Sequence, residues 1–187
     1  MKLPVYLYGE NVLRAVAEDV PADYPELKKL VDDMFETMDG ASGVGLAAPQ
    51  VGLSLKMFVV DGSPLASSFP ECAGTRMAMI NPEVEVIEDV DACSREEGCL
   101  SLPGLSEPVK RVEHVRVKWL DENLEEHERE FSGFISRIIQ HENDHLYGKV
   151  YMDHVSPIRR QLAKGKLSAI AKGNVDCEYR VKRSKRR

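Results

Sequence analysis

The chain has 187 residues, of which 43% are hydrophobic and 30% are charged, and its formal net charge at pH 7 is −6. This length and composition predict one globular domain with a sizeable core. No apolar run reaches the roughly 20 residues that span a bilayer, and the N-terminus lacks an apolar signal region. We therefore expect a cytoplasmic protein with no membrane segment and with four reduced cysteines.

Basic residues are concentrated at the C-terminal end of the chain. Residues 156–187 contain eleven Lys or Arg and two Asp or Glu, so the preceding part of the chain is strongly acidic. A basic end is a candidate for contact with a polyanion, although such segments are often only solvated. We expect a single domain over residues 1–173 and a flexible basic tail over residues 174–187.

The first long element is a helix over residues 25–39, preceded by a short helical turn at Asn11–Arg14. Asp23 is a candidate cap and Gly40 a candidate stop. Apolar residues recur at the i, i+3, i+4, i+7 spacing of an amphipathic helix. They are Leu27, Leu30, Val31, Met34, Phe35 and Met38. We interpret this helix as part of the scaffold, with no catalytic role.

A glycine-containing segment, residues 43–50, follows and precedes a strand predicted at residues 55–60. Its glycines allow the backbone to approach a ligand closely, and Pro49 stiffens the chain before Gln50. Alone, such a segment is more often a turn than a site. The Gln50 carboxamide is nevertheless a candidate donor to an oxyanion, because it is neutral and directional.

Strands dominate the middle of the chain. Residues 61–78 are expected to form a loop without an assigned role, followed by strands at 79–90, 109–120 and 124–131. A turn at residues 121–123 joins the last two strands. Because the connections are local, we expect antiparallel pairing.

Cys99 lies between these strands in the segment Glu96–Gly104, flanked by Gly98 and by a Pro-Gly pair. Its thiolate can bind a metal, and the backbone N–H of Leu100 can donate to a bound substrate. The alternative for a single cysteine is a small buried hydrophobic residue. Cys72, Cys93 and Cys177 lack such a setting and are interpreted as structural.

The segment 140–148 places His141 and His145 one helical turn apart, with Glu142 beside the first histidine. Residues i and i+4 share one face of a helix, so both imidazoles can hold one metal ion while the carboxylate acts as a base. The alternative is that the histidines merely cover a charged helix. The position of a third histidine in one large class of zinc protease is Tyr151 here. The other class takes a glutamate from a following helix, but Gly148 and Pro157 interrupt this one, and Cys99 lies upstream instead.

The last predicted helix begins at Ser156 as cap, with Pro157 at its first position, and ends near Gly173. On the histidine helix, Asp144 has two interpretations: pairing with an arginine such as Arg137 or Arg111, or exposure on a solvated face.

Three motifs, in this order, resemble those of the peptide deformylase family. Residues 43–50 match its Gly-x-Gly-x-Ala-Ala-Pro-Gln motif, residues 97–101 match Glu-Gly-Cys-Leu-Ser, and residues 140–146 match Gln-His-Glu-x-Asp-His-Leu. The resemblance extends over about residues 3–170. The loop at residues 61–78 and the basic tail lie outside the motifs.

The resemblance implies an α+β fold, with antiparallel sheets around a central helix that carries the histidines. It implies a metal-dependent hydrolase that removes the formyl group from the N-terminal formylmethionine of new polypeptides and releases formate. The implied metal is Fe²⁺, with Zn²⁺, Ni²⁺ or Co²⁺ able to substitute. The implied ligands are Cys99, His141 and His145. Glu142 is the implied acid and base, and Gln50 with the Leu100 N–H binds the oxyanion.

The expected partners are N-formylmethionyl peptides, with ribosome contact through the basic tail and with no DNA. The candidate substrate contacts are Val44, Gly45, Phe134 and Ile138. Phe134 and Ile138 belong to the stripe of the histidines, and Val44 and Gly45 to the glycine-containing segment. An apolar slot formed there would select methionine.

Three other functions remain open at this point. The His-Glu pair would also serve a metallopeptidase that cleaves internal bonds, and Cys99 with His141 would serve a cysteine hydrolase. A protein that binds the ribosome or RNA through its basic end is the third. The first is disfavoured by Tyr151 and Cys99, and the second leaves Glu142 and His145 without a role.

Overall fold

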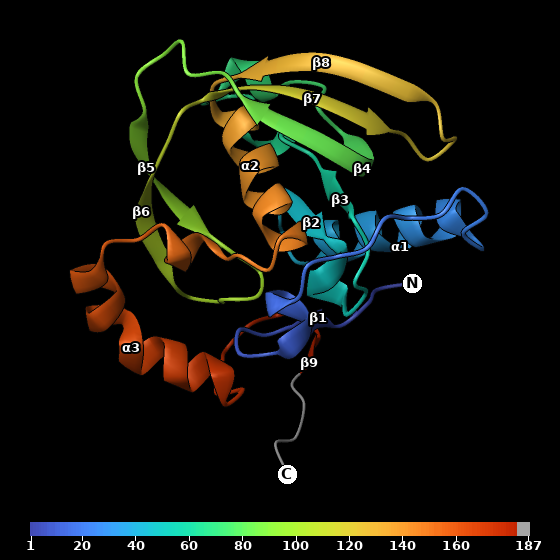
Figure 1. Cartoon of the computed structure of the whole chain (residues 1–187). Coiled ribbons are helices and arrows are strands. Elements are labelled where there is room, and N and C mark those ends of the chain that lie inside the picture. Colours follow the sequence, from blue (N-terminus) through green and yellow to red (C-terminus); the bar gives the residue numbers. More distant parts are fainter. Residues whose placement is uncertain (183–187) are drawn as a thin grey trace.

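The computed structural model describes residues 1–182, which form three α-helices and three β-sheets (Figure 1). The helices are α1 (Leu27–Gly40), α2 (Phe134–Leu146) and α3 (Pro157–Ala171). An antiparallel five-stranded sheet has the order β2-β3-β4-β7-β8. Its strands are β2 (Gly45–Ala47), β3 (Met57–Val60), β4 (Met77–Val86), β7 (His114–Leu120) and β8 (Glu126–Ser132).

The two remaining sheets have two strands each. Strand β5 (Cys93–Gly98) pairs with β6 (Ser106–Arg111) in antiparallel fashion. Strand β1 (Val5–Tyr6) pairs with β9 (Val181–Lys182) in parallel fashion and so joins the two ends of the described chain. Figure 1 shows α2 near the middle of the molecule, with the five-stranded sheet and the β5–β6 sheet around it. The expected α+β fold with a central helix is confirmed.

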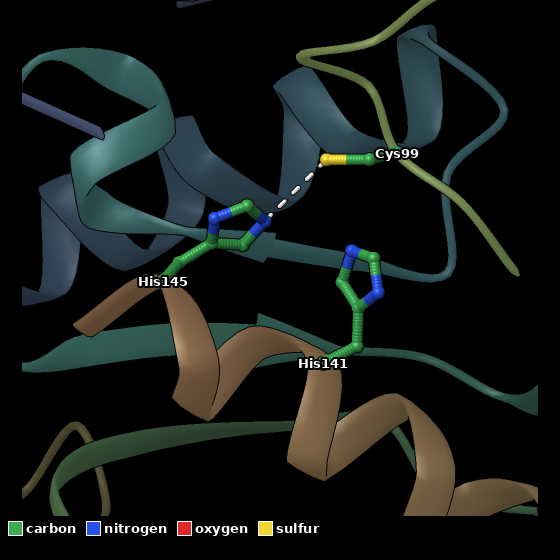
Figure 2. Close-up of side chains that lie close together, drawn as sticks. All are labelled: Cys99, His141 and His145. Atoms are coloured by element: carbon green, nitrogen blue, oxygen red, sulfur yellow. Dashed lines mark hydrogen bonds between the residues drawn. The ribbon is translucent and has the colours of Figure 1, made fainter. Parts of the chain in front are cut away.

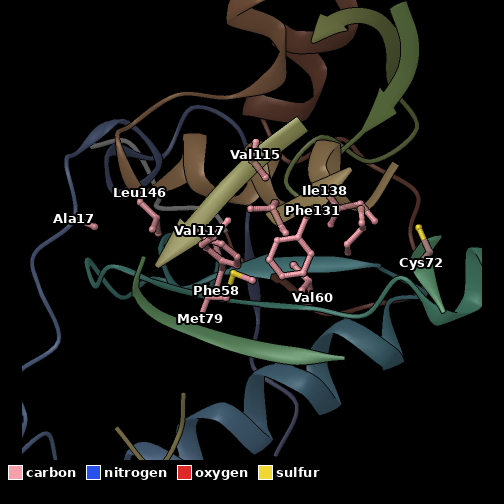
Figure 3. Close-up of a cluster of buried hydrophobic side chains, with 13 residues drawn as sticks. Ala17, Phe58, Val60, Cys72, Met79, Val115, Val117, Phe131, Ile138 and Leu146 are labelled. Carbon is pink, nitrogen blue, oxygen red and sulfur yellow. The ribbon is translucent and has the colours of Figure 1, made fainter. Parts of the chain in front are cut away.

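Helix α2 is held in place by an apolar face packed against the five-stranded sheet. Ile135, Ile138, Ile139 and Leu146 contribute this face and belong to one buried cluster (Figure 3). The sheet residues of the cluster are Ala47, Phe58, Val60, Met79, Val115, Val117 and Phe131. Burying one such side chain contributes about 1.5–3 kcal/mol, so the packing fixes the helix axis and, with it, the direction of the histidines.

Both ends of α2 are defined by specific contacts. At the first turn, the Phe134 N–H donates to Oε1 of Glu71 at 2.8 Å, which places a carboxylate where a helix N-terminus favours negative charge. After the last turn, Gly148 has a φ of +69°, and a Cβ there would lie 2.6 Å from the carbonyl oxygen of Arg14. Only glycine fits this close approach.

The three predicted helices and the 3₁₀ turn at Asn11–Arg14 are confirmed. Ser156 caps α3, and its Oγ accepts from the N–H of Arg159. The prediction of Asp23 as the cap of α1 is wrong, because α1 begins after Glu26, which adopts a left-handed conformation with a φ of 55°.

The strand predictions differ from the structure in several places. Residues 109–120 form two strands in different sheets, because the chain turns at residues 112–113 from β6 to β7. The glycine-containing segment, residues 43–50, includes strand β2, and strand β5 was not predicted. Strand β4 ends at Val86, before the predicted residue 90. The loop at 61–78 contains 3₁₀ turns at Ser63–Leu65 and Pro70–Cys72, and its last two residues begin β4.

The C-terminal segment, residues 174–182, does not form the free tail that the sequence predicted. The N–H of Val5 donates to the carbonyl oxygen of Arg180 at 2.8 Å, just before β9, and the N–H of Leu7 donates to that of Lys182 in β9 at 3.1 Å. Half-buried Val175 and Val181 pack against the buried cluster that includes Leu7 and α3. The rest of the predicted tail, residues 183–187, lies outside the described residues.

Among residues 1–182, no helix combines the length and the apolar character that crossing a bilayer requires.

Candidate active site

Three side chains that can bind a metal converge from two separate segments (Figure 2). Cys99 directly follows β5, while His141 and His145 project from α2 one turn apart. The Sγ of Cys99 lies 3.4 Å from Nε2 of His145, and one ligand atom from each of the three residues lies within 4.8 Å of the others. Both histidines are buried and Cys99 is partly exposed. The candidate ligands from the sequence are therefore brought together.

The outer nitrogen of His141 is fixed by a buried carboxylate. Nδ1 of His141 lies 3.0 Å from Oε2 of Glu97, which leaves Nε2 to face the cluster. Arg111 and Arg137 donate to the same carboxylate at 2.7 and 2.8 Å. Burial favours the neutral acid, but hydrogen bonds with His141 and Arg111 outweigh it and hold the pKa of Glu97 well below its ordinary value. Glu97 thus remains an acceptor that orients the ring.

Asp144 adopts the paired alternative of the two considered from the sequence. Its Oδ2 lies 3.0 Å from Nη1 of Arg111 and 2.8 Å from Nε2 of His154. Because Arg111 also donates to Glu97, the arginine connects two carboxylates on the outer side of the histidine pair. Asp144 therefore helps to hold Arg111, which in turn contacts the carboxylate that orients His141.

The donor set fits a divalent transition metal. One sulfur and two imidazole nitrogens form a borderline-soft set that suits Fe²⁺ or Zn²⁺. Burial, with a smaller effect of the neighbouring His141, lowers the pKa of His145 to about 3, so its ring is neutral and has a lone pair to donate. Buried polar atoms of His145 (Nδ1) and Glu142 (Oε2) have no hydrogen-bond partner among the described residues. Nδ1 of His145 faces away from Cys99, because Nε2 of the same ring contacts the sulfur. The unpartnered oxygen of Glu142 beside the ligands indicates that the site binds a further group.

Glu142 is the carboxylate next to the ligands, and it is 4% exposed. Burial raises the pKa of Glu142 to about 7, with opposing contributions from the surrounding charges. A Cβ on Gly45 would collide with Oε1 of Glu142, so the glycine of β2 provides the space that this carboxylate occupies. The position of Glu142 suits a group that accepts and returns protons near neutral pH.

Gln50 and Leu100 flank the sulfur of Cys99. Oε1 of Gln50 accepts from the N–H of Ala47 at 2.8 Å, which turns Nε2 towards the site. Nε2 lies 3.3 Å from Sγ of Cys99 and 3.3 Å from Oγ of Ser101. The N–H of Leu100 donates to no atom of residues 1–182. The N–H of Leu100 is therefore a free donor, while the amide of Gln50 already has two acceptors.

A cavity of about 770 Å³ opens onto these groups. The four residues expected to contact substrate all line it: Val44, Gly45, Phe134 and Ile138. Cys99, His141 and Glu142 line it as well. Its volume lies in the range of small-molecule and peptide sites, so one opening serves both the ligand cluster and the apolar residues.

Comparison with known proteins assigns the chain to a family. The family model described as "Polypeptide deformylase" matches residues 2–161. The chain belongs to the polypeptide deformylase family. A peptide deformylase of Cytophaga hutchinsonii is 44% identical over 182 residues, covering 97% of each chain. One of Salinibacter ruber is 42% identical, covering 96% of this chain and 93% of the relative. The crystal structure of the Thermus thermophilus peptide deformylase matches with a TM-score of 0.81 and 37% identity, covering 92% of this chain and 99% of that one.

The family membership confirms the resemblance drawn from the three motifs. The protein is a hydrolase of the deformylase family, which removes the N-formyl group from nascent polypeptides and depends on a metal. The metallopeptidase alternative is not favoured.

Two parts of this deformylase site were not predicted from the sequence. The sequence assigns Glu97 only to a family motif, although a carboxylate two residues before a candidate ligand is a signal for a supporting contact. Residues 176–179 also line the cavity, and the basic composition around them gave no indication of this. The available signal was the alternation of Val175, Cys177 and Tyr179 with the acidic Asp176 and Glu178.

We expect Gly45→Ala to lower kcat/KM for a formyl-Met peptide by about 100-fold, because the new methyl group displaces the carboxylate of Glu142. The melting temperature should change little, since a flexible carboxylate can move aside. Steady-state formate release and thermal unfolding measure the two effects. Gly165→Ala on α3 is the control, because a Cβ there meets no atom within 4 Å. Wild-type activity of Gly45→Ala would show that the space is not needed.

Proposed function

We propose that Cys99, His141 and His145 hold the divalent cation of this deformylase and that Glu142 moves the protons of the reaction. The observation that supports this is the convergence of three ligand atoms within 4.8 Å beside a buried carboxylate with an unpartnered oxygen. The substrate is an N-formylmethionyl peptide, and the products are formate and the free N-terminal amine. The reaction takes place in the cytoplasm, where such peptides are made.

The proposed ion is Fe²⁺, for which Zn²⁺, Ni²⁺ or Co²⁺ can substitute. A thiolate adds negative charge and softness to the two imidazoles, which favours these ions over Mg²⁺ or Ca²⁺. When bound, the ion supplies a Lewis acid that polarises the formyl carbonyl and lowers the pKa of water from 15.7 to about 7. Glu97 contributes by keeping His141 in the tautomer that presents Nε2.

Glu142 acts first as base and then as acid. Its unpartnered Oε2 accepts a proton from the attacking water, and the pKa of about 7 makes this exchange feasible near neutral pH. The same oxygen then protonates the nitrogen of the leaving amine. Because Glu142 is buried against Gly45, the carboxylate is held towards the cavity during both steps.

The formyl oxygen gains negative charge during the attack, and the free N–H of Leu100 is the best-placed donor to it. One such donor contributes about 3 kcal/mol to stabilising the transition state. Gln50 can donate as well, but its Nε2 must release the Sγ of Cys99 or the Oγ of Ser101. We therefore assign Gln50 the smaller share of the stabilisation.

The methionine side chain is proposed to enter a slot formed by Val44, Phe134 and Ile138, with the backbone of Gly45 beside it. Phe134 stacks on Phe69 with ring centroids 4.3 Å apart, so its ring presents a fixed apolar wall. Ile138 lies one turn before His141 on α2, which places the slot next to the ligands.

Glu142→Gln should lower kcat for formyl-Met-Ala by about 10²–10⁴-fold while the metal content stays at the wild-type value. The glutamine has the same shape but cannot accept the proton. Formate release and metal analysis of anaerobically purified protein are measured together, with unblocked peptides as the comparison substrate. Cleavage of the unblocked peptides without formate release would contradict the proposed function.

Ile138→Phe should raise the KM for formyl-Met-Ala by about tenfold and leave the KM for formyl-Ala-Ala nearly unchanged. The larger ring fills the slot that methionine occupies, whereas alanine does not reach it. The ratio of the two KM values separates this effect from a general loss of folded enzyme. An unchanged ratio would remove Ile138 from the slot.

We also propose that the basic end of the chain contacts the ribosome, where formylated peptides emerge. Helix α3 presents exposed Lys164 and Lys166, and four of the five residues after Lys182 are basic. Exposed apolar residues lie on the same helix, with Leu162 80% and Ile158 76% exposed. Basic and apolar groups together suit a surface that binds ribosomal RNA and protein.

Removing residues 183–187 should weaken ribosome co-sedimentation at low salt and make its salt dependence shallower, by up to about 0.7–0.9 in slope for each lost phosphate contact. This truncation leaves β9 and the cavity wall in place, so turnover of formyl-Met-Ala should be unchanged. Substituting Ser for the same four basic residues is the matched control for chain length. Identical sedimentation of all three proteins would refute the contact.

A further inference from the structure

The C-terminal segment, residues 174–182, returns to the active site after α3. Asp176, Cys177, Glu178 and Tyr179 line the same 770 Å³ cavity as Cys99 and Glu142. Half-buried Val175, Cys177 and Tyr179 alternate with exposed Asp176 and Glu178, which is the pattern of an extended chain with one side against the protein. The segment lies beyond residue 161, where the match to the family model ends. It therefore lies outside the part of the chain that the family model matches.

Tyr179 contacts the backbone of the turn that carries the catalytic groups. Its hydroxyl donates to the carbonyl oxygen of Leu100 at 2.7 Å. The next carbonyl in the turn, that of Ser101, accepts the N–H of Tyr8 at 2.9 Å. Both ends of the described chain thus hold consecutive peptide groups of the turn after Cys99.

The pairing of β1 with β9 connects the two segments that make these contacts. Tyr8 follows β1 and Tyr179 precedes β9, and the two strands pair at Val5 with Val181 and at Tyr6 with Lys182. Burial raises the pKa of Tyr179, so the hydroxyl keeps its proton and remains a donor. The contact to Leu100 is therefore maintained across the pH range in which an enzyme of this kind operates.

The position of the turn determines where two functional groups point. Cys99 supplies the sulfur, and the N–H of Leu100 is free to donate to the substrate oxygen. On its other side, the turn is closed by the N–H of Leu102, which donates to the carbonyl of Cys99 at 2.8 Å. With the Leu100 carbonyl held by Tyr179, the peptide groups on both sides of Leu100 are fixed, and so is the direction of its N–H.

We propose that Tyr179 is a positioning residue of the deformylase and that residues 174–182 form a wall of its substrate cavity. Tyr179 acts through the Leu100 carbonyl and orients the adjacent N–H for the charge that develops on the formyl oxygen. The inference about catalysis rests on the proposed role of Leu100. The placement of the segment against the turn stands independently of it.

The test compares wild-type protein with Tyr179→Phe, which keeps the ring and removes only the hydroxyl. Tyr24→Phe, in the loop before α1, is the matched control. Each full-length protein is loaded with the same metal, and its kcat and KM for formyl-Met-Ala are normalised to metal content. Hydrogen–deuterium exchange of the peptide that contains residues 99–102 is measured on the same samples, together with the melting temperature.

Tyr179→Phe is expected to lower kcat about fivefold with little change in KM and to speed exchange at residues 99–102, while Tyr24→Phe resembles the wild type. A purely structural role would lower the melting temperature but leave kcat per bound metal unchanged. Wild-type kcat and wild-type exchange in Tyr179→Phe would overturn the inference. If the wild-type protein releases no formate, the proposed function fails, and the exchange measurement still decides whether Tyr179 holds the turn.

Discussion

The buried carboxylate of Glu97 holds together the two parts of the molecule that carry the candidate ligands. It belongs to β5, two residues before Cys99, and it contacts His141 and Arg137 of α2 as well as Arg111 of β6. An unpaired charge at this depth is costly, and removing one partner of a buried pair typically costs about 3–5 kcal/mol. The carboxylate therefore fixes the β5–β6 sheet against the helix, and the sulfur against the imidazoles.

The two sides of α2 have different roles, because one side is apolar and the other carries polar and charged side chains. One side packs apolar side chains against the five-stranded sheet and sets the position of the helix. The other side carries Arg137, His141 and Glu142 towards the β5–β6 sheet and the cavity. The apolar packing tolerates burial without polar partners, whereas the polar side leaves selected atoms of Glu142 and His145 unpartnered. Of these two residues, Glu142 lines the cavity, so its unpartnered oxygen is the one that faces the substrate site.

The helical part of the site could be predicted because its information is local. The spacing of His141 and His145 places them on one face of any helix, and Gly148 ends that helix nearby. The inclusion of Cys99 needed the family resemblance, since no local rule relates it to residues 42 positions later. The separate β5–β6 sheet could not be foreseen, because Val109, Val115 and Val117 continue one alternation across the turn between β6 and β7. The two strands differ in their partners, since β6 pairs with β5 and β7 pairs with β4 and β8.

The structure of the C-terminal segment, residues 174–182, could not be predicted from its composition. Its basic composition predicted a solvated tail, yet the alternation of Val175, Cys177 and Tyr179 packs residues 174–182 against the protein, and β9 pairs with β1. The net charge of a long segment does not reveal a short strand within it. This holds when the segment has few apolar residues and its partner strand is distant in sequence.

The central claim is that one thiolate and two imidazoles bind a single ion. X-ray absorption spectroscopy at the metal edge of anaerobically purified, iron-loaded protein tests it most directly. The account predicts one sulfur and two imidazole nitrogens in the first coordination shell, and loss of the sulfur in Cys99→Ser. A shell without sulfur in the wild-type protein would contradict it.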